Sequence, residues 1–288
     1  MSSPATSSDH GEFQKYKYAP SLAAAVIFII LFSGTTLFHH YQTFRSRTWF
    51  MLPFCLGGLC EIVGYIGRAI SASEPYGNWT LGPYIMQSVL LLVAPALLSA
   101  SVYMELGRIV LWIKGEELLF IRRTWLTKIF VTGDIISFLA QGAGAGLMAG
   151  SDPDQAKTGQ HIIVGGLGVQ VLFFGLFVIA AAIFNSRINR HPTPLASIVP
   201  WRRHMHSLYA VSVLIFIRSI VRMIEFIQGF EGYIISHEVF LYIFDATMMF
   251  FAMVIMNWVH PSQVAKGIRE QMDEKRKVTG VAEAENAV

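Results

Sequence analysis

Hydrophobic residues in this chain come in long blocks separated by short polar stretches. Seven such blocks follow one another: Ser21 to His39, Trp49 to Ile70, Gly82 to Trp112, Ile129 to Met148, His161 to Phe184, Leu208 to Ile227 and Val239 to His260. Each block can cross about 30 Å of hydrocarbon as a helix, which takes roughly 20 residues. The pattern predicts an all-α, polytopic membrane protein with seven transmembrane helices and excludes a barrel of short alternating strands.

These blocks divide the chain into a membrane domain and two polar ends. Residues 1–20 are rich in Ser and lack the short apolar core of a secretory signal, so we expect a disordered extracellular tail. Residues 21–260 form the seven-helix domain, in which the glycine-rich runs at 142–146 and 165–168 predict close helix packing. Residues 261–288 are charged and predict a solvated cytosolic tail, with room for a short surface helix at its start.

Composition and charge narrow the class of protein. Hydrophobic residues make up 53% of the chain and charged residues 14%, and the mean hydropathy of +0.49 lies outside the range of soluble proteins. The formal net charge is only +3, and the basic residues are scattered along the chain. A nucleic-acid partner is therefore not expected, since it requires a concentrated basic surface.

Lys and Arg residues fall mainly on one side of the predicted bundle. Of the 22, 15 lie in the loops after the odd-numbered blocks and in the C-terminal tail, against three on the opposite side. Because cytosolic loops carry this excess, we expect the N-terminus outside and the C-terminus in the cytosol. The sequon that begins at Asn78 then lies outside, as a candidate glycosylation site in a short loop near the membrane.

Ionisable and amide side chains inside the blocks predict a polar interior, because a charge that faces lipid at mid-membrane costs a few kcal/mol. Helical spacing supports this: Glu61, Tyr65 and Arg68 stand at i, i+4 and i+7 on one face. The candidate substrate-binding residues form an outer cluster of Glu61, Tyr65, Arg68, Tyr84, Gln87, Gln170, Arg218, Arg222, Glu225 and Asp245. A smaller cluster toward the cytosol holds Glu105, Arg108 and Asp134.

Two interpretations of the outer cluster stay open. In the first, its acids and bases neutralise one another in structural ion pairs. In the second, they line a hydrated cavity, because so many polar groups in one layer are hard to satisfy without water or a ligand. Estimated depths place Arg222 and Asp245 together and predict an ion pair between them. Glu61, near the middle, is either tied to Arg218 or open to the cavity, where it would sense the charge of a substrate.

No residue pattern supports a covalent chemical step. The histidines lie at block ends or in loops rather than on facing helices, which argues against haem. The carboxylates inside the blocks are opposed by arginines, unlike the His and acidic ligands that converge on a metal. The chain also lacks a phosphate-binding loop, a nucleophile elbow and paired redox cysteines. The sequence therefore predicts no catalytic residue, no cofactor, no metal and no enzyme activity.

Several separate motifs occur in a recognisable order. They are EIVGYIGR at 61–68, PYIMQ at 83–87, YMELGR at 103–108, TGD at 132–134, RxxxRxxE at 218–225, ExxxYxxD at 238–245 and HP at 260–261. Together they resemble the fungal lipid-translocating exporter family, also called the aminocholesterol-resistance or RTA-like family, over about residues 20–261. The resemblance implies a seven-helix protein of the plasma membrane, or less often of an internal membrane, linked to resistance against toxic amphiphiles and to export of sphingoid long-chain bases.

Two functional hypotheses follow. The first is a transporter or translocase for an amphiphile such as a sphingoid base, whose amine needs a carboxylate such as Glu61, while Tyr84 and Gln87 bind hydroxyls. Its partners are membrane lipids or amphiphilic small molecules. The second is a receptor-like lipid sensor, or a regulator of lipid transport, in which Glu105, Arg108 and Asp134 hold the inner side closed until a lipid binds. Members of the family are also associated with sterol-like drugs and porphyrin uptake, so the resemblance implies no single substrate.

Overall fold

A computed structural model describes residues 16–119, 121–148, 153–229 and 232–286, and every regular element within them is helical. The long helices are α1 (Leu22–Ser46), α2 (Leu52–Ser73), α3 (Leu81–Trp112), α4 (Arg123–Met148), α5 (Pro153–Arg190), α6 (Trp201–Gln228) and α9 (Ser262–Asn286). One further crossing consists of three consecutive pieces, α7 (Glu238–Leu241), the π-helical turn η4 (Tyr242–Thr247) and α8 (Met248–Trp258). The 3₁₀ turns η1 (Trp49–Met51), η2 (Glu116–Leu118) and η3 (Leu195–Ser197) lie in connections.

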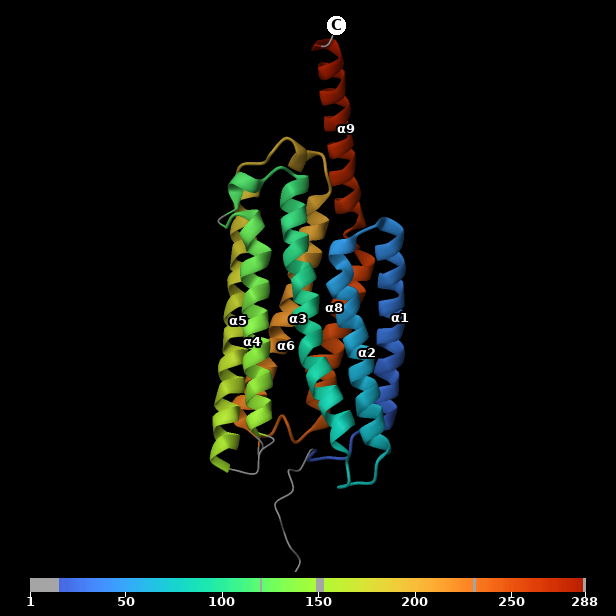
Figure 1. The fold of residues 1–288 in the computed structure, drawn as a ribbon, viewed down its shortest axis with the longest axis vertical. Helices are drawn as coiled ribbons and strands as arrows, with labels where there is room; N and C mark the ends of the chain where they lie inside the picture. The colour runs from blue at the N-terminus through green and yellow to red at the C-terminus, as the bar shows by residue number, and fades with distance from the viewer. Residues whose placement is uncertain (1–15, 120, 149–152, 230–231, 287–288) are drawn as a thin grey trace, which may run out of the picture.

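The crossings form an elongated bundle (Figure 1). Helices α1 and α2 lie on one side, α4 and α5 on the other, and α3 and α6 between them. Six helical units are long and apolar enough to span a membrane. Helix α6 is the seventh crossing and packs against α3, α5 and α8. The seven-helix, multi-pass prediction is therefore confirmed. The start of α1 and helix α9 lie at opposite ends of the bundle, which we call the N-terminal end and the α9 end (Figure 1).

Several helices are longer than their apolar blocks. Helix α1 begins after Ser21, whose hydroxyl accepts a hydrogen bond from the Ala24 amide, and continues to Ser46 rather than ending at His39. It ends at Arg47, which adopts a left-handed backbone conformation with φ of 53°. Hydropathy marks the part of a helix that suits lipid, whereas hydrogen bonding continues into the polar flanks. The number of crossings can therefore be predicted from the sequence, whereas the residues at which the helices begin and end cannot.

Glycine brings two pairs of helices into close contact. A Cβ atom at Gly64 of α2 would lie 2.7 Å from Leu91 Cδ2 of α3. A Cβ atom at Gly144 of α4 would lie 2.5 Å from the carbonyl oxygen of Gly159 in α5. Small residues let the backbones approach, which is the main route to tight packing inside a membrane. The expectation of close packing at residues 142–146 agrees with this contact.

Both ends of the chain differ from the expected free tails. Residues 1–15 lie outside the described residues, but Tyr16 is buried against the bundle, so residues 16–20 belong to the folded domain. The C-terminal segment is helical over Ser262–Asn286. Its first part is fixed to the bundle, because Gln271 donates to the Trp112 carbonyl at 3.0 Å and Arg269 to the Ser46 carbonyl at 2.9 Å. The docking of these two segments could not be predicted, because it depends on short apolar stretches and single side-chain hydrogen bonds, which leave no periodic pattern in the sequence.

Candidate functional site

The polar groups at the N-terminal end are arranged around Arg218 of α6. Its Nε donates to Asp245 Oδ1 at 2.7 Å, and both side chains are almost fully buried. Asp245 lies inside the π turn η4, a local widening of a helix that is common at functional sites. The expected pair of Arg222 with Asp245 is wrong: Arg222 Nη1 instead donates to Glu225 Oε2 at 2.8 Å, three residues along the same helix.

A proline creates the second acceptor for Arg218. Pro95 stands inside α3 and has no amide hydrogen, so the carbonyl oxygen of Leu91, four residues earlier, lacks its normal helical donor. Nη2 of Arg218 donates to that oxygen at 2.7 Å. The guanidinium therefore joins α3, α6 and the π turn. No spacing rule in the sequence points to a backbone carbonyl as the partner.

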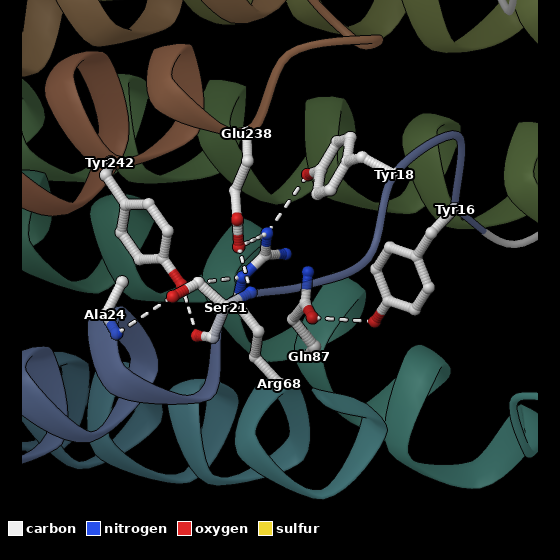
Figure 2. Close-up of polar contacts among 8 residues, drawn as sticks. All are labelled: Tyr16, Tyr18, Ser21, Ala24, Arg68, Gln87, Glu238 and Tyr242. Carbon is white, nitrogen blue, oxygen red and sulfur yellow. Dashed lines mark hydrogen bonds and ion pairs between the residues drawn. The ribbon is translucent and has the colours of Figure 1, made fainter. Parts of the chain in front are cut away.

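Arg68 forms a second ion pair, with Glu238, shown in Figure 2. Nη2 of the buried Arg68 lies 2.6 Å from Oε1 of the part-buried Glu238 and donates to the Tyr18 hydroxyl at 3.0 Å, and Nε donates to the Tyr242 hydroxyl at 3.0 Å. The rings of Tyr16, Tyr18 and Tyr242 surround the guanidinium, with centroids 5.3 to 5.8 Å from Cζ. This environment favours a cation through both charge and ring faces.

The N-terminal segment closes over this pair. The backbone amide of Ser21 donates to Glu238 Oε1 at 2.8 Å, and the Tyr16 hydroxyl donates to Gln87 Oε1 at 2.8 Å (Figure 2). Tyr84 packs edge-on against the Tyr16 ring at 5.3 Å. Burial raises the pKa of the Tyr16 hydroxyl to about 12, so it remains a hydrogen-bond donor at physiological pH. Tyr16 and Tyr18 were missed by the sequence reading because they precede any helical pattern.

A small pocket opens beside these pairs, with a volume of about 40 Å³, which is room for roughly three waters. Its walls come from α6, the 229–237 connection, α7, η4 and the N-terminal segment. The lining residues are Tyr18, Arg218, Val221, Arg222, Glu225, Ile234, Ile235, His237, Phe240, Leu241, Phe244 and Asp245. It therefore combines two ion pairs with an apolar wall, as an amphiphile would require.

Glu61 lies deeper and is fully buried. Among the described residues neither of its carboxylate oxygens has a hydrogen-bond partner, and the charged groups that act on it are Asp245 and Arg218. The charged groups of the site are Glu61, Arg68, Arg218, Arg222, Glu225, Glu238 and Asp245, which we call the charged site. Its four carboxylates outnumber its three guanidinium groups, and Glu61 is the carboxylate left without a direct partner.

Several residues singled out from the sequence make no hydrogen bond or ion pair with the charged site in the described part of the chain. Tyr65 lies near Glu61, Arg68 and Asp245, but it is buried among aromatic rings and its hydroxyl has no hydrogen-bond partner among the described residues. Gln170 of α5 accepts from Gln141 of α4 at 3.3 Å, so it belongs to the α4–α5 interface. The side chain of Asn78 is exposed in the 74–80 connection.

The inner cluster is not held together by ion pairs in the described part of the chain. Asp134 accepts hydrogen bonds from the hydroxyl groups of Ser99 and Tyr103 at 2.9 and 3.0 Å. Arg108 is exposed and lies over the Phe50 ring at 5.4 Å. The nearest basic group to Glu105 is His204 instead. Helical spacing placed these three residues at similar depth, but it could not show that they face different neighbours.

Comparison with known proteins now identifies the family. A family model described as RTA1 like protein matches residues 54–268, which include α2 to α8 and the charged site. The chain belongs to the RTA1-like family. This confirms the resemblance carried by its motifs. No solved structure matches the chain.

Among the curated relatives of this RTA1-like chain, some are named for uptake or transport of a molecule. Protoporphyrin uptake protein 1 of Saccharomyces cerevisiae is 40% identical over 278 residues, 84% of this chain and 90% of the relative. The probable lipid transporter atnI of Emericella nidulans is 30% identical, covering 88% and 68%. Sphingoid long-chain base transporter RSB1 of S. cerevisiae is 27% identical, covering 86% and 73%. These names describe transporters or uptake proteins, not enzymes.

Proposed function

We propose that this protein is a translocase for amphiphilic lipids with a cationic headgroup, such as sphingoid long-chain bases, and that it confers resistance to toxic amphiphiles. It acts in the plasma membrane, with the N-terminal end of the bundle outside and α9 in the cytosol. The names of relatives support membrane lipid transport at the level of the family. The loop bias of Lys and Arg supports the orientation.

The observation that carries the proposal is the unpartnered carboxylate of Glu61. A buried carboxylate without hydrogen bonds is costly, and an incoming ammonium group would remove that cost. The excess of one carboxylate in the charged site also favours binding of a cation. Arg218 competes for Glu61, and an amine that binds Glu61 leaves Arg218 to Asp245 and Leu91, which it already contacts.

The pocket supplies the entry route. Its 40 Å³ volume is too small for a headgroup, so Tyr18 and the Arg222–Glu225 pair must move before a lipid enters. That pair joins two residues of one helix and is partly exposed, so its opening is inexpensive. The apolar wall contributed by Phe240 and Phe244 suits an alkyl chain. Tyr84 and Gln87 remain candidate partners for headgroup hydroxyls.

The first prediction tests Glu61 directly. Glu61→Gln keeps the size of the side chain and removes its charge, so the protein should reach the membrane while losing the attraction for an amine. Cells that express the variant should lose most of the protection against a sphingoid base. Surface delivery is measured by labelling, and melting of the purified protein shows whether it is folded.

Asp134→Asn is the matched control, because it neutralises a buried carboxylate outside the pocket whose Oδ2 already accepts hydrogen bonds from two hydroxyl groups. Full protection by delivered Glu61→Gln would show that amine binding there is wrong. Misfolding of Glu61→Gln, with folded Asp134→Asn, would assign Glu61 a structural role with Arg218 or Asp245. The sensor alternative is less favoured, since it relies on a joined Glu105, Arg108 and Asp134.

A further inference from the structure

A second group of buried ionisable side chains lies near the α9 end, outside the charged site. Glu105 of α3 and His204 of α6 are 0% and 1% exposed, and Oε1 of Glu105 lies 3.7 Å from Nδ1 of His204. Among the described residues, neither carboxylate oxygen and neither ring nitrogen has a hydrogen-bond partner. The structure gives each of these groups only the other as a neighbour of opposite sign.

Such a pair is suited to hold one proton. With one proton it is neutral overall, either as a carboxylic acid beside neutral imidazole or as a carboxylate beside imidazolium. Without a proton it carries one negative charge, and with two it carries one positive charge. Both charged states are expensive away from water, so the number of bound protons depends on whether water reaches the pair.

The titratable groups near the pair include two histidines. His204 acts on His260, which lies in the connection between α8 and α9. His39 of α1 follows, with its ring centroid 6.1 Å from that of His260. Asp134 of α4 is bonded to Ser99 and Tyr103 instead. His260 is itself buried, at 7% exposed, so water reaches these histidines only when the helices around them separate.

The pair and the charged site are carried by the same two helices. Arg218 of α6 donates to Leu91 of α3, and His204 of α6 faces Glu105 of α3 about four turns further along both helices. A change in the distance between α3 and α6 at one contact therefore alters the other. An amine at Glu61 removes the attraction between that carboxylate and Arg218 and so changes the first contact, whereas water entry at the α9 end changes the second.

We infer that Glu105 and His204 form a proton-binding site whose loading is coupled to translocation of the lipid. This rests on the proposed function. One proton passes from the solvent at the α9 end to the pair when it is negative and makes it neutral. The same proton returns to solvent when α3 and α6 separate and water reaches the pair. No bond other than that to the proton forms or breaks.

The test measures flux of a fluorescent long-chain base in vesicles of phosphatidylcholine and phosphatidylglycerol, at equal pH on both sides. The pH series is run for the wild type, Glu105→Gln and His204→Gln, with Glu270→Gln, which removes an exposed carboxylate paired with Lys266, as control. The ratio of wild-type to variant rate at each pH cancels titration of the base itself. For a single coupled proton, this ratio should change on the order of tenfold per pH unit over the titrating range for Glu105→Gln, and stay constant for Glu270→Gln.

Constant ratios for both Glu105→Gln and His204→Gln, with active wild type, would overturn the proton site and leave the proposed function intact. Absence of flux by the wild type would remove the proposed function and this inference with it. If gel filtration shows that Glu105→Gln does not fold, the test rests on His204→Gln: a rate ratio that changes with pH supports the proton site, and a constant ratio overturns it.

Discussion

Arg218 has the largest structural role among the charged residues, because it satisfies a carboxylate and a backbone carbonyl together. Its two bonds of 2.7 Å join Asp245 and Leu91, and the side chains of Arg218 and Asp245 are almost fully buried. Removing Arg218 or Asp245 alone leaves the other charge buried without its counter-charge, whereas removing both leaves no buried charge to neutralise. The pair is therefore expected to show strong non-additivity.

Asp245→Asn should lower the free energy of unfolding on the order of 3 kcal/mol, because the Arg218 charge loses its carboxylate. A double variant, Arg218→Met with Asp245→Leu, should recover part of that loss. Melting in detergent measures both. Glu270→Gln, which removes an exposed pair with Lys266, is the control and should cost about 0–1 kcal/mol. A double variant no more stable than Asp245→Asn would argue against a direct energetic coupling.

At the residue scale the sequence predicted most of the charged side chains that face inward, but not their partners, and Arg108, which was expected inside, is exposed. Glu61, Arg68, Arg218 and Asp245 all lie in the bundle interior as their spacing indicated. Which residues pair depends on where each helix ends and on axial shifts of less than one turn between helices. The π turn also changes the direction in which Asp245 points around its helix. Arg222 is satisfied within its own helix, so it does not reach across to Asp245.

At the element scale, the contact between α4 and α5 depends on single glycines. Gly144→Ala should destabilise the protein by about 1–3 kcal/mol, since the added methyl meets the Gly159 backbone oxygen at 2.5 Å, which can be relieved only by separating the helices. Gly146→Ala, two residues along, has nothing within 4 Å and should have no such cost, with a gain of up to about 1 kcal/mol in helix propensity. Melting curves of the two variants make the comparison, and equal loss in both would contradict the contact.

The helix count could be predicted because apolar length is a direct requirement of the bilayer. The broken seventh crossing could not, since Glu238, Tyr242 and Asp245 also fit an unbroken α-helix with one polar face. Nor could the docking of α9 on Trp112, which depends on one glycine, Gly267, where a Cβ atom would clash with the indole ring. Local interactions of this kind produce no periodic pattern in the sequence, so hydrophobic periodicity does not predict them.

At the scale of the whole molecule, the two ends of the bundle carry different chemistry. The N-terminal end holds the charged site and the α9 end holds the basic loops. Epitope tags at the N-terminus and the C-terminus should therefore be detected on opposite sides of the membrane, with the N-terminal tag outside, by labelling intact and permeabilised cells. A glycan on Asn78, detected as a mass shift that an amidase removes, would independently place that end outside. Both tags in the cytosol would contradict the topology.

The π turn also ties the two buried ion pairs to a single backbone event. An α-helix turns by about 100° per residue, so closing the extra residue of η4 into regular helix would rotate everything before it by that angle. Glu238 would turn away from Arg68 as Asp245 turned away from Arg218. The two guanidinium groups would then lose their carboxylates in the same step, so the geometry of η4 sets both ion pairs together.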